Sequence, residues 1–183
     1  MYNLNIAFTC HLYMWDYANK VFDSYPTEKR VVQKMIEIGL SVRIVLDEVK
    51  IFFDMVEVKP NALAKAYHVD RRVIVNLLKR IVDDVKLFDF FSNLKPVSNL
   101  SEAGSRMGFG VIQIIPENAT KSGIIAGVIS VISENDISIK EVITDDPDMI
   151  ENPKAIIVTA VPLSGEIINK IKGINGVRGI VVL

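Results

Sequence analysis

The stretch that decides the fold reads Gly110-Val-Ile-Gln-Ile-Ile115 and resumes as Ser122-Gly-Ile-Ile-Ala-Gly-Val-Ile-Ser-Val-Ile-Ser-Glu-Asn-Asp-Ile-Ser-Ile139. The first part is a short apolar run rich in β-branched residues, which predicts a strand over residues 108–115. The second part is apolar for about three helical turns, which predicts a buried helix over residues 121–134. The apolar residues after it predict a second strand over residues 136–143.

The rest of the C-terminal half continues this alternation. Further β-branched runs predict strands over residues 155–161 and 177–183, and a helix over residues 164–171 that ends at Gly173. The order is βαββαβ in about 75 residues. It predicts a ferredoxin-like, split-βαβ layer with both helices on one face of the sheet.

The N-terminal half shows mainly helical spacing. We expect a helix over residues 27–38 that ends at Gly39, then a hairpin of strands 41–46 and 49–53 around Asp47-Glu48. A short helix over residues 61–67, a turn at His68-Val69 and a longer helix over residues 71–85, capped by Asp70, form a helix-turn-helix pattern. The expected core face of the longer helix is Val73, Leu77, Leu78, Ile81 and Val85. The fold class is therefore α+β.

Composition narrows the possible classes of function. Half of the 183 residues are apolar and 23% are charged, a balance typical of a globular protein. Mean hydropathy is +0.30, yet no apolar run reaches the roughly 20 residues that a membrane-spanning helix needs. The net charge of −1 argues against a protein that coats nucleic acid. One cysteine and two histidines make a structural zinc site unexpected and fit a reducing cytoplasm, and we expect no cofactor.

We expect four segments along the chain. Residues 1–13 carry no Lys or Arg, and Met14 follows them at once. We interpret these residues as a non-native or disordered extension and expect translation to begin at Met14. Residues 14–97 form the helix-turn-helix-like domain, the turn-rich residues 98–107 a linker, and residues 108–183 the second domain.

Basic residues concentrate in the helix-turn-helix pattern. The window from Lys59 to Arg80 holds six cations and one anion, Asp70. In such units the start of the second helix faces the bases of the major groove, so Arg71 and Arg72 are candidate base contacts. The candidate phosphate contacts are Lys65, Lys79 and Arg80. The alternative is a helical packing domain with a solvated basic face.

The loop over residues 116–123 is a candidate anion site. A helix start leaves free backbone N–H groups that can hold a carboxylate, and Asn118, Thr120 and Ser122 add polar side chains. Gly123 would let a ligand approach closely. The alternative is an ordinary capped helix. The acidic residues 144–153 are interpreted as a solvated loop, and no catalytic or metal-binding pattern is visible, so we expect neither an enzyme nor a metal site.

The stretches quoted at the outset resemble an ACT domain, the amino-acid-sensing βαββαβ module. The family loop commonly ends Asp-x-Pro-Gly, whereas this chain reads Thr120-Lys-Ser-Gly123. From Met14 onward the chain resembles archaeal predicted regulators of amino acid metabolism, which join a DNA-binding-like domain to an ACT domain. The stretches that carry this resemblance are Val69-Asp-Arg-Arg-Val73, Asn93-Leu-Lys-Pro-Val97 and Asp145-Asp-Pro-Asp-Met-Ile-Glu-Asn-Pro-Lys154.

This resemblance implies a small effector, an amino acid, bound against the first loop at the interface of two protomers. By position the binding residues are Glu117, Asn118, Ala119, Thr120, Lys121, Ser122 and Gly123. The apolar strand 177–183 is a candidate edge for a homodimer. We therefore expect an amino-acid-responsive transcriptional regulator that contacts double-stranded DNA. The alternative is a regulatory module that acts on an enzyme or another protein without DNA.

Overall fold

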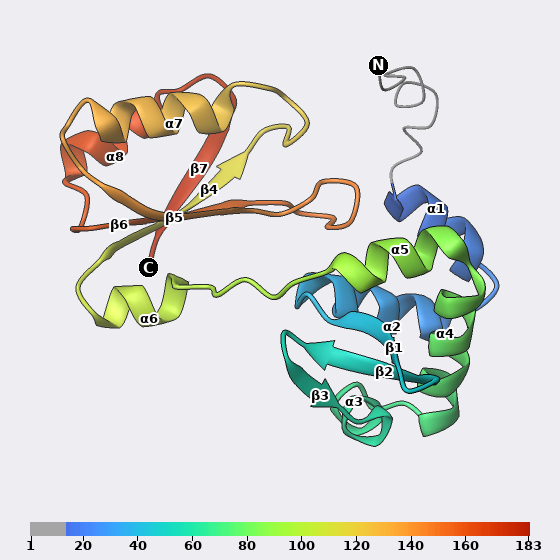
Figure 1. The fold of residues 1–183 in the computed structure, drawn as a ribbon. Helices are drawn as coiled ribbons and strands as arrows, with labels where there is room; N and C mark the ends of the chain where they lie inside the picture. Colours follow the sequence, from blue (N-terminus) through green and yellow to red (C-terminus); the bar gives the residue numbers. More distant parts are fainter. Residues whose placement is uncertain (1–13) are drawn as a thin grey trace, which may run out of the picture. The chain divides into compact units, whose positions relative to one another are not determined.

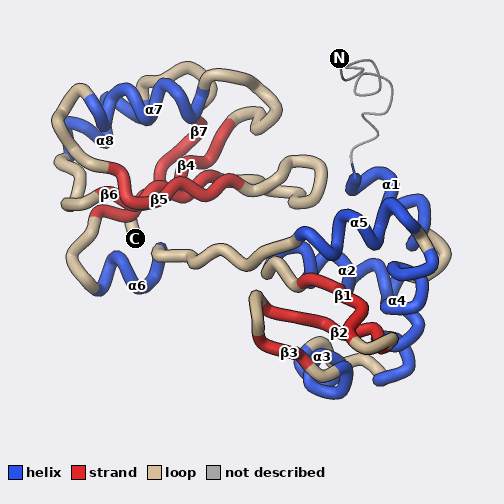
Figure 2. The backbone as a smooth tube through the Cα atoms, in the orientation of Figure 1, coloured by secondary structure: helices blue, strands red, loops and turns tan. Residues whose placement is uncertain are grey.

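The computed structural model describes residues 14–183, so the expected extension at residues 1–13 lies outside the described residues. The chain divides between Val97 and Ser98 into two compact units, which we call the N-terminal and the C-terminal unit. The described residues form eight helices and two antiparallel sheets, a mixed α+β protein as predicted (Figures 1 and 2). None of these helices combines the length and apolarity needed to cross a membrane.

The N-terminal unit packs helices around a small sheet. Its helices are α1 (Met14–Phe22), α2 (Pro26–Glu37), α3 (Pro60–Ala66), α4 (Arg71–Asp83) and α5 (Val85–Asn93). Its sheet has the order β1-β2-β3 and comprises β1 (Ser41–Val45), β2 (Glu48–Phe53) and β3 (Val56–Val58). Large side chains from helices and strands share one fully buried core: Phe22, Met35, Ile51, Ile74, Leu77, Ile81, Leu87 and Phe91.

The hairpin differs from its prediction in two ways. Its turn residues are Leu46 and Asp47, both with positive φ (52° and 60°), rather than Asp47-Glu48. Positive φ at both central residues is the type I′ geometry that matches strand twist. A third strand, β3, then pairs with β2 after a turn in which Asp54 also has positive φ, at 54°. This strand has only three residues, too few for an alternation to be recognised in the sequence.

Helix α4 is shorter than predicted, and its buried face is displaced. The buried residues are Ile74, Leu77, Leu78 and Ile81. Val73 is only half-buried and Val85 is 82% exposed, so the prediction that both belong to the core is wrong. The reason is Asp84, whose carboxylate accepts hydrogen bonds from the N–H groups of Lys86 and Leu87, both at 3.0 Å, and so starts a separate helix, α5.

Gly39 ends the segment after α2, as predicted, and has φ +69°. The backbone of Lys95 crosses so close that a Cβ at Gly39 would lie 2.3 Å from the Lys95 carbonyl oxygen. The position therefore needs glycine for two reasons, its backbone conformation and the close approach of another segment.

The C-terminal unit has the predicted βαββαβ order of elements. These are β4 (Gly110–Pro116), α7 (Ile124–Ser133), β5 (Ile139–Thr144), β6 (Ala155–Thr159), α8 (Gly165–Lys172) and β7 (Val177–Val182). The sheet order is β5-β6-β4-β7, with every neighbouring pair antiparallel. Strands β4 and β5 both pair with β6, so they run in the same direction and finish at the same end of the sheet. The core between sheet and helices is Ile112, Ile114, Val128, Ile132, Ile157 and Ile171.

The predicted linker over residues 98–107 is wrong in part, because it contains helix α6 (Ser101–Arg106). Helices α7 and α8 cover one face of the sheet, whereas α6 lies on the opposite face (Figure 1). At Gly104 a Cβ would be 3.3 Å from the side chain of Val158, so α6 lies very close to the strands. The small residues that resemble a linker are what allow this approach. The Leu100 N–H donates to Glu141 Oε2 at 2.8 Å and ties the preceding residue to β5.

Candidate functional site

The α3–α4 pair has the tight turn that its sequence predicts. Tyr67 ends α3, and His68 follows with φ 52°. The Asp70 carboxylate then accepts a hydrogen bond from the Arg72 N–H at 2.7 Å and caps α4. This cap fixes where the first turn of α4 begins, and therefore where Arg71 and Arg72 lie.

Four of the five predicted DNA contacts are exposed cations. Arg71, Arg72 and Lys79 lie on α4 and Lys65 lies on α3, and within residues 14–183 none of the four forms an ion pair. Residues four apart share a helix face, so Arg71, Val75 and Lys79 form one exposed row. Arg72 and Asn76 form the next row. We call these five residues the α4 face.

Asn76 is not among the contacts predicted from the sequence. Its amide carries both donors and acceptors, and Asn is a residue type that reads adenine in the major groove. The signal was available, since Asn76 follows Arg72 by four residues and such pairs lie on one helix face.

Arg80 has a different place from the one predicted. Its Nε donates to Glu28 Oε2 at 2.9 Å, and its guanidinium lies 3.5 Å from the centroid of the Tyr25 ring. Glu28 is only 7% exposed. Arg80 therefore joins α4 to α2 inside the N-terminal unit, and we remove it from the candidate nucleic-acid contacts.

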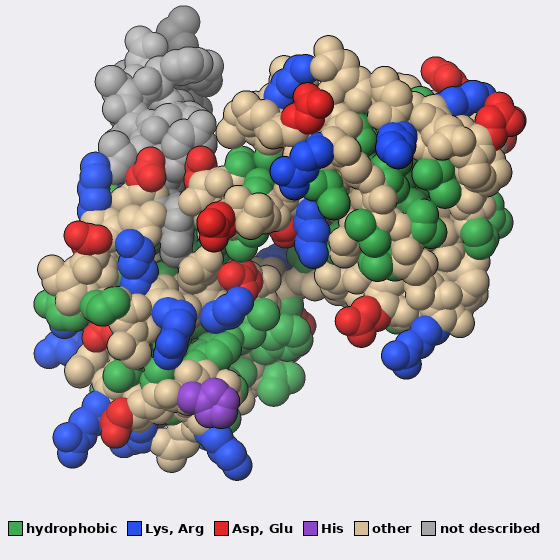
Figure 3. Space-filling view, turned by 180° about the vertical axis from the view of Figure 1, so that it is seen from behind, with side chains coloured by type: hydrophobic (Ala, Val, Ile, Leu, Met, Phe, Trp, Pro, Cys, Tyr) green, Lys and Arg blue, Asp and Glu red, His purple; other side chains and the backbone are tan. Residues whose placement is uncertain are grey.

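An apolar groove of about 350 Å³ runs beside the α4 face. The charged residues Arg71, Lys79 and Asp83 line it together with apolar residues: Val49, Pro60, Val75, Leu78 and Val82. A groove with cations beside an apolar floor can bind a protein segment as well as a phosphate backbone. In Figure 3 basic and acidic side chains are interspersed over the visible face of each unit. Neither visible face therefore carries charge of one sign only.

The loop predicted to bind the effector, residues 117–123, is held by its own side chains and by a neighbouring loop; we call it the effector loop. Asn118 Oδ1 accepts from the Thr120 N–H at 2.9 Å and from the Thr120 hydroxyl at 2.8 Å. The Glu117 N–H donates to the Gly176 carbonyl at 2.8 Å, and Lys121 Nζ donates to Asn175 Oδ1 at 2.9 Å. Several of the polar atoms expected to meet a ligand therefore already form hydrogen bonds within the protein. These bonds hold the loop in place without a ligand.

Helix α7 starts three residues later than predicted, because residues 120–123 form a turn. Gly123 is its N-cap and has φ +91°, and a Cβ there would meet no atom within 4 Å. The first-turn N–H groups, beginning at Ile124, have no acceptor within the helix. Gly123 thus leaves open space beside the helix start.

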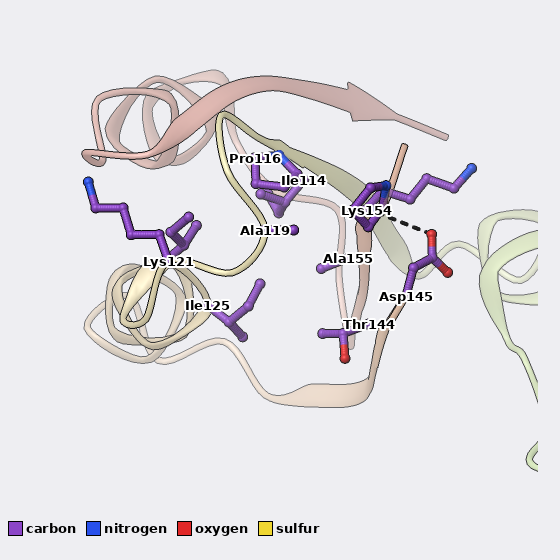
Figure 4. A pocket seen from close by; sticks show the side chains of 11 residues that line it. Ile114, Pro116, Ala119, Lys121, Ile125, Thr144, Asp145, Lys154 and Ala155 are labelled. Atoms are coloured by element: carbon purple, nitrogen blue, oxygen red, sulfur yellow. Dashed lines mark hydrogen bonds between the residues drawn. The ribbon is translucent and has the colours of Figure 1, made fainter. Parts of the chain in front are cut away.

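A cavity of about 70 Å³ opens at this same end of the C-terminal unit (Figure 4). Its walls come from β4, the effector loop, the first turn of α7 and the chain between β5 and β6. The lining residues are Ile114, Pro116, Ala119, Lys121, Ile124, Ile125, Thr144, Asp145, Pro153, Lys154 and Ala155. Of the predicted effector residues, Ala119 and Lys121 line this cavity, whereas Glu117, Asn118, Thr120, Ser122 and Gly123 do not.

The sequence indicates only a solvated loop over residues 144–153, yet Thr144, Asp145 and Pro153 line the cavity. The Asp145 N–H donates to the Lys154 carbonyl at 2.9 Å, and Asp145 Oδ2 accepts from the Lys154 N–H at 3.1 Å. The order of elements could have indicated this part of the cavity wall, because β4 and β5 run in the same direction and so finish at the same end of the sheet.

Charged groups near the cavity leave its interior apolar. Figure 4 shows the amino groups of Lys121 and Lys154 and the carboxylate of Asp145 directed away from the cavity. The side chains that close it are mainly aliphatic, among them Ile114, Ala119 and Ile125. The cavity is therefore suited to an apolar group.

Among residues 14–183, no cluster of three or more His, Cys, Asp or Glu side chains could hold a metal ion. Comparison with protein-family models finds no match for the chain, and comparison with curated proteins finds none. The candidate sites therefore stand on the geometry of the described residues.

Proposed function

We propose that this chain is an amino-acid-responsive regulatory protein of the cytoplasm. The C-terminal unit binds a small effector at the end of its sheet, and the N-terminal unit binds double-stranded DNA through the α4 face. The observation that carries the proposal is the cavity beside the effector loop. It lies at the loop to which the resemblance to ACT domains assigns the effector.

The effector part rests on the open space beside the start of α7. N–H groups without an acceptor attract a carboxylate, and Gly123 brings no side chain that would block one. Strand β7 lies at the edge of the sheet; its residues Val181 and Val182 are 40% and 58% exposed, and Leu183, which follows it, is 47% exposed. An apolar edge strand of this kind favours pairing with a second copy, as in the homodimers of the family that the chain resembles.

The DNA part rests on cations at a capped helix that form no ion pair among residues 14–183. Lys79 on α4 and Lys65 on α3 leave their charge free for phosphates, and Arg71 and Arg72 at the start of α4 leave theirs free for base edges. Asn76 on the same surface provides an amide that can read a base edge.

The second candidate is a regulatory module that acts on an enzyme or another protein without DNA. The groove of Val49, Val75, Leu78 and Val82 favours it, because an apolar floor gives a protein segment something to bury.

The effector part is tested by the thermal midpoint of the full chain with each of the twenty amino acids in turn. A ligand that binds only the folded state raises stability by RT ln(1 + [L]/Kd). At least one amino acid should raise the midpoint in a concentration-dependent manner. A midpoint unmoved by all twenty at millimolar concentration would contradict the proposal.

The DNA part is tested by the salt dependence of binding to genomic DNA fragments. Replacing Lys65 and Lys79 by Ala removes two exposed candidate phosphate contacts and should reduce the magnitude of the slope of log K against log salt by about two. The matched control is Lys172→Ala with Arg178→Ala, two exposed cations of the C-terminal unit. Equal, weak binding by wild type and both double variants would favour the protein-partner candidate.

A further inference from the structure

The cavity at the effector loop has walls that select one chemistry. Ile114, Ile125 and Ala155 form apolar parts of its lining, and Ala119 closes it from the loop side. The amino groups of Lys121 and Lys154 and the carboxylate of Asp145 are all directed outward (Figure 4), so among these lining residues no charged group reaches in to meet a polar side chain. A polar group inside would lose its water without gaining a charged partner.

The size of the cavity limits the occupant further. A single water needs about 10–15 Å³ of such volume, so the 70 Å³ cavity has room for about five non-hydrogen atoms. The side chains of valine, leucine and isoleucine have three or four carbons and fit. The seven carbons of the phenylalanine side chain exceed the space.

We propose that this cavity binds the side chain of the effector, and that the effector is therefore a short aliphatic amino acid such as valine, leucine or isoleucine. The inference rests on the proposed function and adds the chemical class of the ligand. The amino and carboxylate groups of the effector stay at the mouth of the cavity. There they keep contact with water and with the outward-directed polar groups of Lys121, Asp145 and Lys154.

Leucine and asparagine provide the sharpest comparison of ligands, because their side chains have nearly the same shape and differ in polarity. Each buried methylene is worth about fourfold in affinity. The two terminal methyl groups of leucine should therefore give it at least a tenfold lower Kd than asparagine. Phenylalanine should bind at least tenfold more weakly than leucine, because it does not fit.

Two variants test whether this cavity is the place of binding. Ala119→Leu fills the cavity from the loop and should raise the Kd for leucine at least tenfold. Its control is Ala126→Leu, which adds the same atoms at an exposed position of α7 and should leave the Kd unchanged. Ile125→Ala enlarges the cavity and should improve phenylalanine binding relative to leucine, a gain that misfolding cannot produce.

The measurement is isothermal titration calorimetry of the full chain with leucine, valine, asparagine and phenylalanine, with thermal midpoints as a check on folding. The inference is supported if the chain binds leucine and valine more tightly than asparagine and phenylalanine, and if this preference is lost in Ala119→Leu and retained in Ala126→Leu. Tighter binding of a polar or charged amino acid overturns the inference and leaves the proposed function standing. Unaltered leucine binding by Ala119→Leu also overturns it, whereas no binding of any amino acid overturns both.

Discussion

Arg80 of α4 and Glu28 of α2 form an ion pair in which Nε lies 2.9 Å from Oε2, and the Glu28 side chain is 9% exposed. This contact separates the basic residues of α4 into two kinds. Arg80 belongs to the packing of the N-terminal unit, whereas Lys79, its neighbour in sequence, is exposed and forms no ion pair within residues 14–183. Adjacent cations in one motif therefore serve different purposes.

Replacing Arg80 by Ala should lower the free energy of unfolding by about 2 kcal/mol. The change leaves the Glu28 carboxylate buried without its partner, and the partial exposure of Arg80 keeps the cost below that of a fully buried pair. Lys79→Ala is the control and should change stability by less than about 0.5 kcal/mol. Urea unfolding of both variants checks this, and equal stabilities would show that the ion pair contributes nothing measurable.

Asp84 should make the stability of the N-terminal unit dependent on pH. Burial alone would raise the pKa of Asp84, but hydrogen bonds from the Leu87 N–H, the Tyr17 hydroxyl and the Lys86 N–H outweigh it and lower that pKa. An acid with a lowered folded-state pKa contributes stability above its unfolded pKa of about 4, and this contribution disappears as pH falls through the folded-state value.

Asp84→Ala should therefore cost about 1 kcal/mol at pH 7, the usual worth of an N-cap. The difference from wild type should shrink as the pH is lowered from 5 to 3. Asp89→Ala removes one exposed carboxylate from the same helix and serves as the control for general charge effects. A gap between Asp84→Ala and wild type that stays constant across this range would refute the assigned role of the carboxylate.

Gly123 and Gly165 offer a matched pair for backbone strain at the start of a helix. At neither glycine would a Cβ meet an atom within 4 Å, but only Gly123 has a positive φ, at +91°. Gly123→Ala should therefore destabilise the chain by about 1–2 kcal/mol, whereas Gly165→Ala should be neutral or slightly stabilising. Chemical denaturation measures the free energy of unfolding of both variants. Equal changes in that free energy would mean that the left-handed backbone conformation at Gly123 is not required.

The elements predicted from the sequence are those with strong local signals. The Asp70 cap, the β-branched runs of β4 and β6, and the Ser164 and Gly173 ends of α8 are visible without knowledge of the rest of the chain. Such local features fix a helix or strand nearly independently of its neighbours.

The features that the sequence did not reveal depend on tertiary neighbours. The sequence of α6 resembles a linker, and only the close approach of Gly104 to Val158 explains why a helix packs there. Arg80 resembles a free cation in the sequence, and only the structure shows its hydrogen bond to Glu28. Asp145 resembles a solvated acid because its companions around the cavity lie on other elements. Sequence spacing alone does not reveal such pairings.

The measurement that tests the central claim most directly is the affinity of the full chain for DNA with and without saturating leucine, for wild type and Ala119→Leu. If the C-terminal unit senses an effector and the α4 face reports it, leucine should change the wild-type affinity at least fivefold and leave the variant unaffected. Equal wild-type affinities with and without leucine, under conditions in which leucine is bound, would contradict the account.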